Sequence, residues 1–314
     1  MPSFSCIVED SITPGLRLDR YAAEYLKILS RSQIKARKLS AHLDGKPVKI
    51  SRVLKGGERL ELSWLEPESA FLIPEDIPLD VIYEDERVIV VNKAQGMVVH
   101  PGAGNRQGTM ANALLYRRLK KAGLCTAADN APGLTLDTGL RPGIVHRLDK
   151  DTSGVIIAAW DNEAHAFLSD QFKQRKVRKS YAALVQGNPK EAQGRIEKRI
   201  VRSRFNRKIF TVSENEGRPS LTFYRVVRSY GNYSLLLLRP KTGRTHQLRV
   251  HLKYMGNPIL GDPVYGRFDA TFPRSTLMLH AKRLSVVLPR SLAVKTFRTR
   301  LPARFRAIFD VLNR

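Results

Sequence analysis

Apolar residues recur with two different periods along the chain, and the period separates the predicted helices from the predicted strands. Between residues 18 and 26 they repeat at spacings of three and four, which predicts a helix with one apolar face. Residues 88–93 and 155–159 are nearly continuous apolar runs, which predict central strands. Residues 161–174 return to the helical period behind Asp161, a favourable N-cap. The pattern thus predicts helices packed against a buried sheet.

Most other apolar positions alternate with polar ones or lie in short runs, as in half-buried strands. Further strands are predicted over residues 179–186, 220–229 and 234–240, a strand pair over 276–288, and helices over 245–255 and 304–312. Residues 123–140 are rich in Ala, Gly, Thr and Asp and predict a mobile loop. The pattern favours an α+β fold with a mixed, largely antiparallel sheet.

The first part of the chain predicts a separate, smaller α/β module. Ser30 is placed to cap a second short helix that carries the cations Arg31, Lys35 and Lys38. Alternating apolar residues on both sides of Asp44-Gly45 then predict a hairpin. Residues 67–79, with their acids and prolines, are typical of a linker. We therefore predict one domain over residues 1–66 and a larger one over residues 80–314.

Charge adds a functional indication to this picture. The 314 residues include 54 Lys and Arg against 29 Asp and Glu, a formal net charge of +25. The cations cluster at residues 27–55, 172–210 and 273–314. A single basic run is often only a solvated surface, but three of the same sign favour a composite surface for a polyanion.

Several classes of protein are disfavoured. No apolar run approaches the roughly 20 residues needed to span a bilayer. The N-terminus lacks the basic-then-apolar pattern of an export signal. Cys6 and Cys125 are too few and too far apart for a disulfide framework or a zinc site. We expect a cytoplasmic protein.

One carboxylate lies at a position suited to chemistry. Residues 143–154 have the sequence Gly-Ile-Val-His-Arg-Leu-Asp-Lys-Asp-Thr-Ser-Gly, in which Asp149 lies between Arg147 and Lys150. The residues after it are good turn and cap types, which explains them without function. Asp149 precedes that turn and is flanked by cations, so we predict that it is the reactive group.

A reactive carboxylate in a partly dry site needs a nearby guanidinium to stay charged. The best remote candidate is Arg244, within residues 241–251 (Lys-Thr-Gly-Arg-Thr-His-Gln-Leu-Arg-Val-His). There a strand is predicted to end, Gly243 to turn, and a helix with an apolar face to begin. We predict that Arg244 lies beside Asp149. The alternative is a solvent-facing arginine on an ordinary turn.

Other chemistries have weaker support. His246 and His251 lie five residues apart on the predicted helix, so they face different directions and make a poor metal pair. Asp149 and Asp151 are likewise a poor match for the facing carboxyl pair of a glycosidase. Residues 102–108 are rich in glycine but lack the signature of a phosphate loop, which favours a simple turn.

Four segments together resemble the RluA-type pseudouridine synthases. They are residues 143–154, 179–183 (Lys-Ser-Tyr-Ala-Ala), 242–251 and 261–266 (Gly-Asp-Pro-Val-Tyr-Gly). Their order and spacing agree with the family, and the resemblance covers about residues 80–290. Residues 15–64 resemble an S4-type RNA-binding module, the usual N-terminal partner in part of that family.

The resemblance implies a role for five residues of the larger domain. Asp149 matches the catalytic aspartate, and Arg244 matches the arginine that pairs with it. Tyr181 matches the tyrosine that stacks on the target base and is placed to help remove its C5 proton. Arg147 matches the arginine thought to fill the gap left by the flipped nucleotide, and Leu248 an aliphatic residue of the same pocket.

Four further residues are assigned to binding. His146, next to Arg147, is expected to contact the substrate. Arg31, Lys35 and Lys38 of the S4-like module are expected to contact RNA. A charged helix in such a module would hold a structured RNA by its phosphates and shape.

The implied reaction converts uridine in RNA to pseudouridine without a metal, nicotinamide or nucleotide cofactor. The expected partner is RNA, with large-subunit ribosomal RNA favoured and transfer RNA as the alternative. A non-catalytic RNA-binding or assembly protein with the same fold stays open as a second function. No membrane association is expected, and nothing in the sequence requires more than a monomer.

Overall fold

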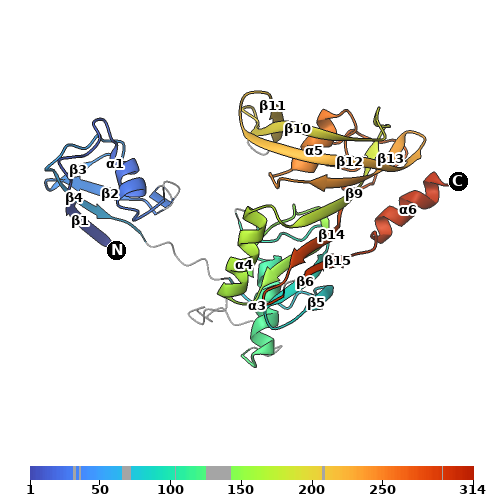
Figure 1. Ribbon diagram of the computed structural model, residues 1–314, viewed down its shortest axis with the longest axis horizontal. Helices are drawn as coiled ribbons and strands as arrows, with labels where there is room; N and C mark the ends of the chain where they lie inside the picture. Colours follow the sequence, from blue (N-terminus) through green and yellow to red (C-terminus); the bar gives the residue numbers. More distant parts are fainter. Residues whose placement is uncertain are drawn as a thin grey trace. The chain divides into compact units, whose positions relative to one another are not determined.

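The computed structural model describes residues 1–30, 33–34, 37–65, 72–102, 104–124, 143–206, 209–291 and 293–314. These residues form two compact units, Met1–Phe71 and Leu72–Arg314 (Figure 1). The sequence predicted a division in the same region, with a linker over residues 67–79. Residues 72–79 are instead held by the second unit, where the Asn112 side chain donates to Ile73 O at 2.8 Å and Glu75 accepts from Gly108 N.

The first unit is a small antiparallel sheet covered by a short helical segment. Its strands, in the order β1-β4-β2-β3, are Ser3–Ile7, Arg59–Ser63, Ser40–Leu43 and Lys46–Val48. The helix α1, Leu18–Arg20, continues into one π-helical turn, Tyr21–Tyr25. The predicted apolar face is present at Leu18, Tyr21 and Ala22, which are buried, but not at Tyr25, which is 55% exposed.

The hairpin turn and the helix cap predicted in this unit are both present. Asp44 and Gly45 both have positive φ, 49° and 78°, as the central residues of a two-residue hairpin turn require. Ser30 caps a helical turn, because its hydroxyl accepts from Gln33 N while the Gln33 side chain accepts from Ser30 N. Of the three predicted RNA-contacting cations, Arg31 and Lys35 lie outside the described residues and Lys38 is exposed.

The second unit is built on one long mixed sheet, in which all strand pairs except one are antiparallel. The strand order is β11-β10-β12-β13-β9-β14-β8-β6-β5, with β15 pairing to β14 and β7 to β8. The strands before the middle of the chain are β5 Val81–Glu84, β6 Val88–Lys93, β7 Gly143–Ile144 and β8 Ser153–Ala159. Those after it are β9 Arg178–Gln186, β10 Gln193–Arg202, β11 Phe210–Ser213, β12 Arg218–Tyr230, β13 Tyr233–Pro240, β14 Leu279–Val287 and β15 Val294–Arg298. Only β8 and β14 run parallel.

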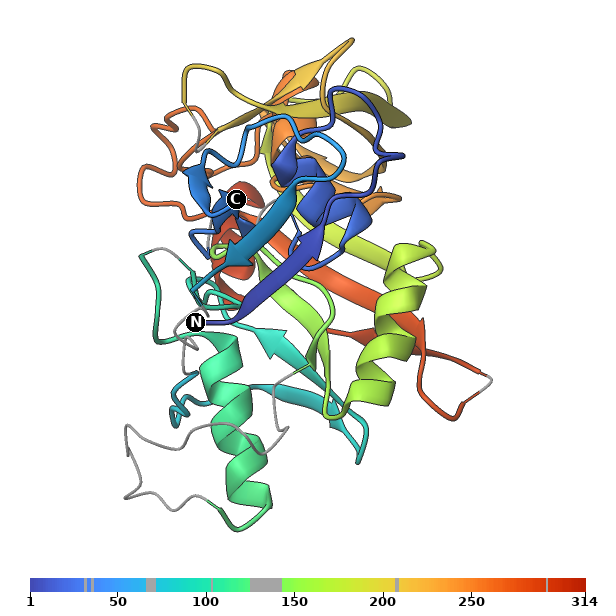
Figure 2. The ribbon, with the colours of Figure 1, turned by 90° about the vertical axis from the view of Figure 1, so that its left-hand side faces the viewer.

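Helices cover both faces of this sheet. They are α3 Met110–Lys121, α4 Asn162–Lys173, α5 Gln247–Tyr254 and α6 Ala303–Leu312. Every residue of β8 is buried, and its successive side chains enter two different clusters, one with α4 and one with α3. Because neighbouring strand residues point to opposite faces, α3 and α4 cover opposite sides of β8. Figure 2 shows both as the two long helices in teal and yellow-green.

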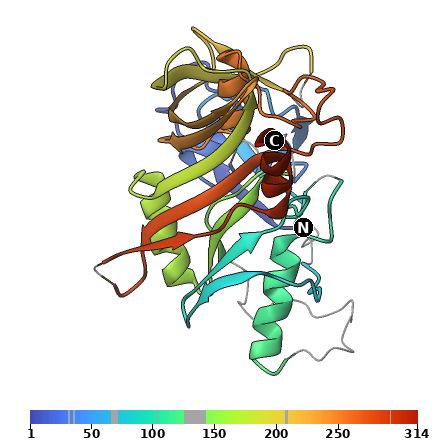
Figure 3. The ribbon, with the colours of Figure 1, turned by 90° about the vertical axis from the view of Figure 1, so that its right-hand side faces the viewer.

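Most predicted elements of this unit are present. The fold is α+β with a mixed, largely antiparallel sheet, as predicted. Asp161 caps α4 by accepting from Ala164 N at 2.8 Å. The strand pair predicted over residues 276–288 is wrong, since that segment holds the single strand β14, whose hairpin partner β15 follows it (Figure 3). The predicted loop at residues 123–140 lies almost entirely outside the described residues.

The sheet opens at the junction of β9 and β13. Pairing between these strands runs from Tyr233↔Gln186 to Leu238↔Tyr181 and ends there. Beyond that point Arg178–Ser180 pair only with β14, whereas Arg239 and Pro240 pair only with β12. The two halves of the sheet therefore separate next to Tyr181.

Candidate active site

A cavity of about 510 Å³ lies where β9 and β13 separate. It is lined by residues of five segments, namely 145–149 with Thr152, the end of α4, the segment that leads into β9 and its start, residues 240–249, and Leu279 on β14. Six residues that the sequence singled out line it together: His146, Arg147, Asp149, Tyr181, Arg244 and Leu248. The structure therefore brings into one cavity predicted residues that lie up to about a hundred positions apart in the sequence.

The segment that carries Asp149 is fixed from below by a buried lysine. Lys93, at the end of β6, is 1% exposed. Its ammonium donates to the carbonyl oxygens of Ala94, Met97 and Lys150 at 2.8–3.0 Å. Burial lowers the pKa of Lys93 to about 8, while the nearby carboxylates of Asp151 and Asp149 oppose this shift. One side chain thus ties the residue after Asp149 to β6.

A glycine closes the same segment on its other side. Gly154 pairs with Ala281 where β8 runs beside β14, and it has φ 120°. A Cβ at this position would lie 2.2 Å from Ala281 O, closer than any real Cβ contact. The final glycine of the 143–154 motif is therefore required by the close approach of the two parallel strands.

The ion-pair partner of Asp149 is Arg249. Arg249 Nη1 lies 3.6 Å from Asp149 Oδ2, and the two side chains are 4% and 20% exposed. Arg249 is itself held by Asp262, which accepts from Nε and Nη2 at 2.7 Å each. Burial would raise the pKa of Asp262, but the Arg249 guanidinium and the amides of Tyr265 and Val264 lower it overall. Arg249 is thus a buried cation fixed by one carboxylate and directed at another.

The prediction that Arg244 would be this partner is wrong. Its guanidinium Nε donates to Pro219 O at 3.3 Å, and its pKa is lowered by burial and by the neighbouring charges of Arg218 and Arg175. Arg244 therefore lines the cavity among other cations rather than against the carboxylate.

The polar residues around Arg244 fix the turn that precedes α5. Gln247 accepts from the Thr242 hydroxyl at 2.7 Å and from Arg244 N at 3.0 Å. Its amide group also donates to Leu221 O and to the Thr222 hydroxyl on β12. This network leaves α5 starting from the left-handed His246, and it sets the direction in which Arg249 projects.

Tyr181 lies at the last position where β9 pairs with β13, against the cavity. Burial, together with the charge of Asp149, raises the pKa of Tyr181 well above that of an exposed phenol. Ionising it would place two negative groups side by side away from water. Tyr181 is therefore a neutral phenol beside the carboxylate, with an aromatic ring available for stacking.

His146 is held inside the fold. Its Nε2 accepts from Ile157 N on β8 at 3.1 Å, and its ring stacks on Phe172 of α4 with 4.4 Å between centroids. Burial and the neighbouring Lys179 charge lower its pKa to about 3. A neutral His146 thus pins the motif to β8 and α4, and Arg147 beside it remains exposed.

Sequence reasoning missed Arg249 and Asp262, although both lie inside motifs it had marked. The available signal was composition: Arg249 falls within a predicted helix whose neighbours are apolar, and a buried arginine requires a carboxylate. Asp262, in the Gly-Asp-Pro-Val-Tyr-Gly segment, supplies that carboxylate with 0% side-chain exposure. The pattern could not show that all of residues 247–252 are buried.

The part of the chain that the structure describes contains neither a group of metal ligands nor a membrane-spanning helix. No three or more His, Cys, Asp or Glu side chains are grouped there to hold a metal ion. None of the helices in that part is both long enough and apolar enough to cross a membrane.

Comparison with known proteins gives a consistent result. Residues 87–254 match the family described as RNA pseudouridylate synthase. The chain is 43% identical to "Ribosomal large subunit pseudouridine synthase D" of Borreliella burgdorferi, over 93% of this chain and 88% of that protein. It is 37% identical to the protein of the same name from Zymomonas mobilis, over 95% and 94% of the two chains.

Solved structures agree with the sequence relatives. The human RNA Pseudouridylate Synthase Domain Containing 4 superposes with a TM-score of 0.59 at 25% identity, covering 74% of this chain and 92% of the other. The human Domain Containing 1 protein gives 0.55 at 27% identity, covering 79% and 98%. Both superpositions extend over most of this chain and support the same fold.

Proposed function

The chain belongs to the RNA pseudouridylate synthase family and isomerises uridine to pseudouridine in RNA, and we propose that its substrate is large-subunit ribosomal RNA, with Asp149 as the reactive group. Two relatives that share about 40% of their residues with it carry the name of a large-subunit enzyme. The observation that most directly supports the site is that the Asp149 carboxylate is 20% exposed in a cavity and is paired with a fixed guanidinium.

The isomerisation leaves the composition of the nucleoside unchanged, although its C5 proton is lost to solvent, and it needs only a carboxylate and a shaped pocket. The N1–C1′ bond breaks, the base turns, C5 bonds to C1′, and a proton leaves C5 while N1 gains one. Asp149 acts on the nucleoside from the cavity wall. Arg249 holds that carboxylate in position and offsets its charge during the reaction.

Tyr181 and Leu248 form the proposed walls for the base. Tyr181 offers its ring face as a neutral phenol, and Leu248 offers an apolar edge that is 7% exposed. Such a pocket accepts a flat pyrimidine while excluding water from the reacting carbons. The raised pKa keeps Tyr181 a neutral phenol, and its proposed roles are to stack its ring on the base and to help remove the C5 proton.

The target nucleotide must leave its stack in the RNA to enter this cavity. Extrusion costs a few kcal/mol, which contacts to the RNA backbone offset. Arg147 is exposed at the cavity wall and can stack its planar guanidinium where the base had been. Arg244, among Arg218 and Arg175, is placed to meet a phosphate next to the target.

We further propose that the first unit is an S4-like RNA-binding module. Its apolar helical face, its hairpin and its exposed Lys38 fit the resemblance seen in the sequence. The protein then acts as a monomer in the cytoplasm, without membrane association.

The test is tritium release from transcribed large-subunit ribosomal RNA that contains [5-³H]uridine. Asp149→Asn keeps the shape of the side chain but removes its charge, so we expect kcat to fall by a factor of at least about 10³, or about 4 kcal/mol. Binding of the RNA should stay within a few-fold of the parent. Near-parental release by this variant would refute the assignment.

Asp151→Asn is the matched control, because it neutralises a carboxylate two residues away that does not line the cavity. It should keep most of the activity. The same assay with transcribed transfer RNA as substrate distinguishes the two candidate RNAs.

A further inference from the structure

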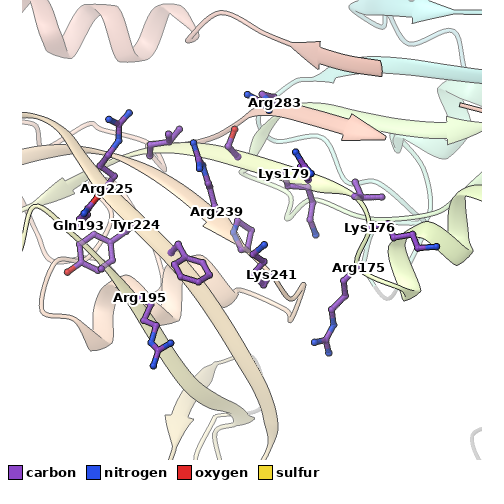
Figure 4. Close-up of a pocket in the computed structure, with 17 residues that line it drawn as sticks. Arg175, Lys176, Lys179, Gln193, Arg195, Tyr224, Arg225, Arg239, Lys241 and Arg283 are labelled. Carbon is purple, nitrogen blue, oxygen red and sulfur yellow. The ribbon is translucent and has the colours of Figure 1, made fainter. Parts of the chain in front are cut away.

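A second, larger cavity adjoins the active site on the other half of the open sheet. It measures about 1350 Å³ and shares Arg175, Val177, Lys179, Pro240 and Lys241 with the catalytic cavity. We call it the basic groove. Nine of its lining residues are cations, drawn from β9, β10, β12, β13, β14, the segment before β9 and the turn after β13: Arg175, Lys176, Arg178, Lys179, Arg195, Arg225, Arg239, Lys241 and Arg283 (Figure 4).

The charge of this groove has almost no counterpart in the protein. None of the described residues that line it is acidic. Only Arg195 has a carboxylate within 4 Å, Glu197 at 3.8 Å, and both side chains are more than 60% exposed. The other eight cations form no ion pair within the described residues. Uncompensated cations in one concavity attract a polyanion and concentrate it there.

The floor of the groove also presents an aromatic ring between two arginines. Phe223 on β12 lies directly opposite Arg195 on β10 and directly opposite Arg239 on β13. These three residues form one row across three strands and project from the same face. Arg225, two residues after Phe223, projects from that face as well.

The ring of Phe223 is open to a ligand. The side chain is 37% exposed, an unusual state for a phenylalanine in the middle of a sheet. Among the described residues, no aromatic ring or cation stacks on Phe223. By contrast, the ring of Phe210 on β11 is covered by Arg202, whose guanidinium lies 5.1 Å from the ring centre.

We propose that the basic groove binds an unpaired segment of the substrate RNA, with one base stacked on Phe223 and its phosphates on Arg195, Arg225 and Arg239. This inference rests on the proposed function, since it extends the path of the RNA from the catalytic cavity. Aromatic rings on a sheet, flanked by cations, are a general solution for holding single-stranded RNA. The shared residues Lys179 and Lys241 make the path continuous.

An unpaired segment fits these observations better than a duplex. A duplex offers only phosphates and groove edges, so it would use the arginines but leave Phe223 against water. A single strand can turn a base face onto the ring, and each such stack strengthens binding roughly 5- to 100-fold. The proposal therefore predicts that charge and aromatic variants respond differently to the form of the RNA.

Binding of two fluorescein-labelled probes separates the two contributions. The probes are a 12-nucleotide oligouridylate and a 12-base-pair RNA duplex, titrated against the full chain at several salt concentrations. Phe223→Ala should weaken oligouridylate binding roughly 5- to 100-fold and duplex binding much less. Arg195→Gln with Arg239→Gln should lower the magnitude of the oligouridylate salt slope by about 1.4, for two phosphates lost.

Matched controls lie outside both cavities. Phe268→Ala removes a ring that is 83% exposed, and Arg106→Gln with Arg267→Gln removes two exposed charges that lie outside the three basic runs. Both controls should bind like the parent. If Phe223→Ala equalled Phe268→Ala, or weakened the two probes equally, the stacking platform would be excluded. If the two charge doubles gave the same salt slope, the phosphate path would be excluded.

Activity on transcribed large-subunit ribosomal RNA keeps this proposal separate from the proposed function. With an active parent, the Phe223 and arginine variants should raise KM more than they lower kcat, and an unchanged KM would overturn the groove as an RNA site. An inactive parent would instead overturn the proposed substrate. The oligouridylate experiment would still decide the groove in that case.

Discussion

The catalytic cavity and the basic groove share a wall, but they treat their cations in opposite ways. In the cavity, Arg249 is 4% exposed and held between two carboxylates of the protein itself. In the groove, eight of nine lining cations have no carboxylate partner among the described residues. The arginine that orients the reactive carboxylate is neutralised by carboxylates of the fold, whereas the cations proposed to bind RNA are left without a carboxylate partner. The first arrangement supports chemistry and the second supports affinity.

The largest effect is expected at Asp262, the carboxylate that neutralises the buried cation of the cavity. Asp262→Asn leaves Arg249 buried with only the more distant Asp149 for a partner, so the guanidinium is drawn toward the reactive carboxylate. Removing one partner of a buried pair costs about 3–5 kcal/mol. We expect that loss in the free energy of unfolding by urea, and we expect kcat to fall by a factor of at least about 100, or about 2.7 kcal/mol.

The control for Asp262 is an ion pair on the surface. Arg204 and Glu216 lie 2.5 Å apart with side chains 79% and 55% exposed, so Glu216→Gln should cost less than about 1 kcal/mol. An Asp262→Asn variant as stable as Glu216→Gln would show that the fold does not depend on the buried pair.

The difference between the two regions also explains what the sequence could and could not predict. Asp149 was predicted from its flanking charges, whereas Tyr181 and Leu248 were assigned only through the family resemblance, and all three line the cavity. The prediction of Arg244 as the partner of Asp149 failed because the local pattern did not show that Arg249, five residues later, is the buried arginine. Burial of Arg249 depends on Asp262, thirteen residues later, and on the packing of α5 against the sheet. Neither is visible in a local pattern.

The fold shows the same limit. Continuous apolar runs predicted β6 and β8 because burial on both faces leaves a local record in the sequence. The opening between β9 and β13 left no such record, since the strands that pair with Arg239 and Pro240 are set by long-range register. The row of Arg195, Phe223 and Arg239 comes from three strands and exists only once their register is known.

A buried histidine, His280, predicts that the protein loses stability in acid. Burial, helped by Arg304 and Lys282, lowers the pKa of His280 to about 4, and the ring bonds the hydroxyls of Ser153 and Thr299. In the unfolded chain a histidine binds its proton near pH 6.5. Stability from this group is therefore complete above pH 6.5 and is lost as the pH falls toward 4, on the order of 3 kcal/mol at pH 4.

The measurement is the urea midpoint between pH 7 and pH 4. His280→Gln should start lower at pH 7 but decline less on acidification than the parent. His100→Gln changes an exposed histidine and should keep the parental decline. Equal declines for all three proteins would mean that His280 does not link folding to protons.

The smallest expected effect lies at Arg244, which lines the catalytic cavity but not the basic groove. Because its guanidinium faces Pro219 O and other cations rather than Asp149, Arg244→Gln should raise KM for ribosomal RNA about five- to tenfold, or about 1–1.4 kcal/mol. The turnover rate should change less than about threefold. Arg244→Lys should recover most of the affinity, since a phosphate accepts either cation. A turnover rate reduced by about two orders of magnitude, with KM unchanged, would instead place Arg244 with the reactive carboxylate. Arg244, five residues before Arg249, would then belong with the cations that position the reactive carboxylate and not with those left to bind RNA.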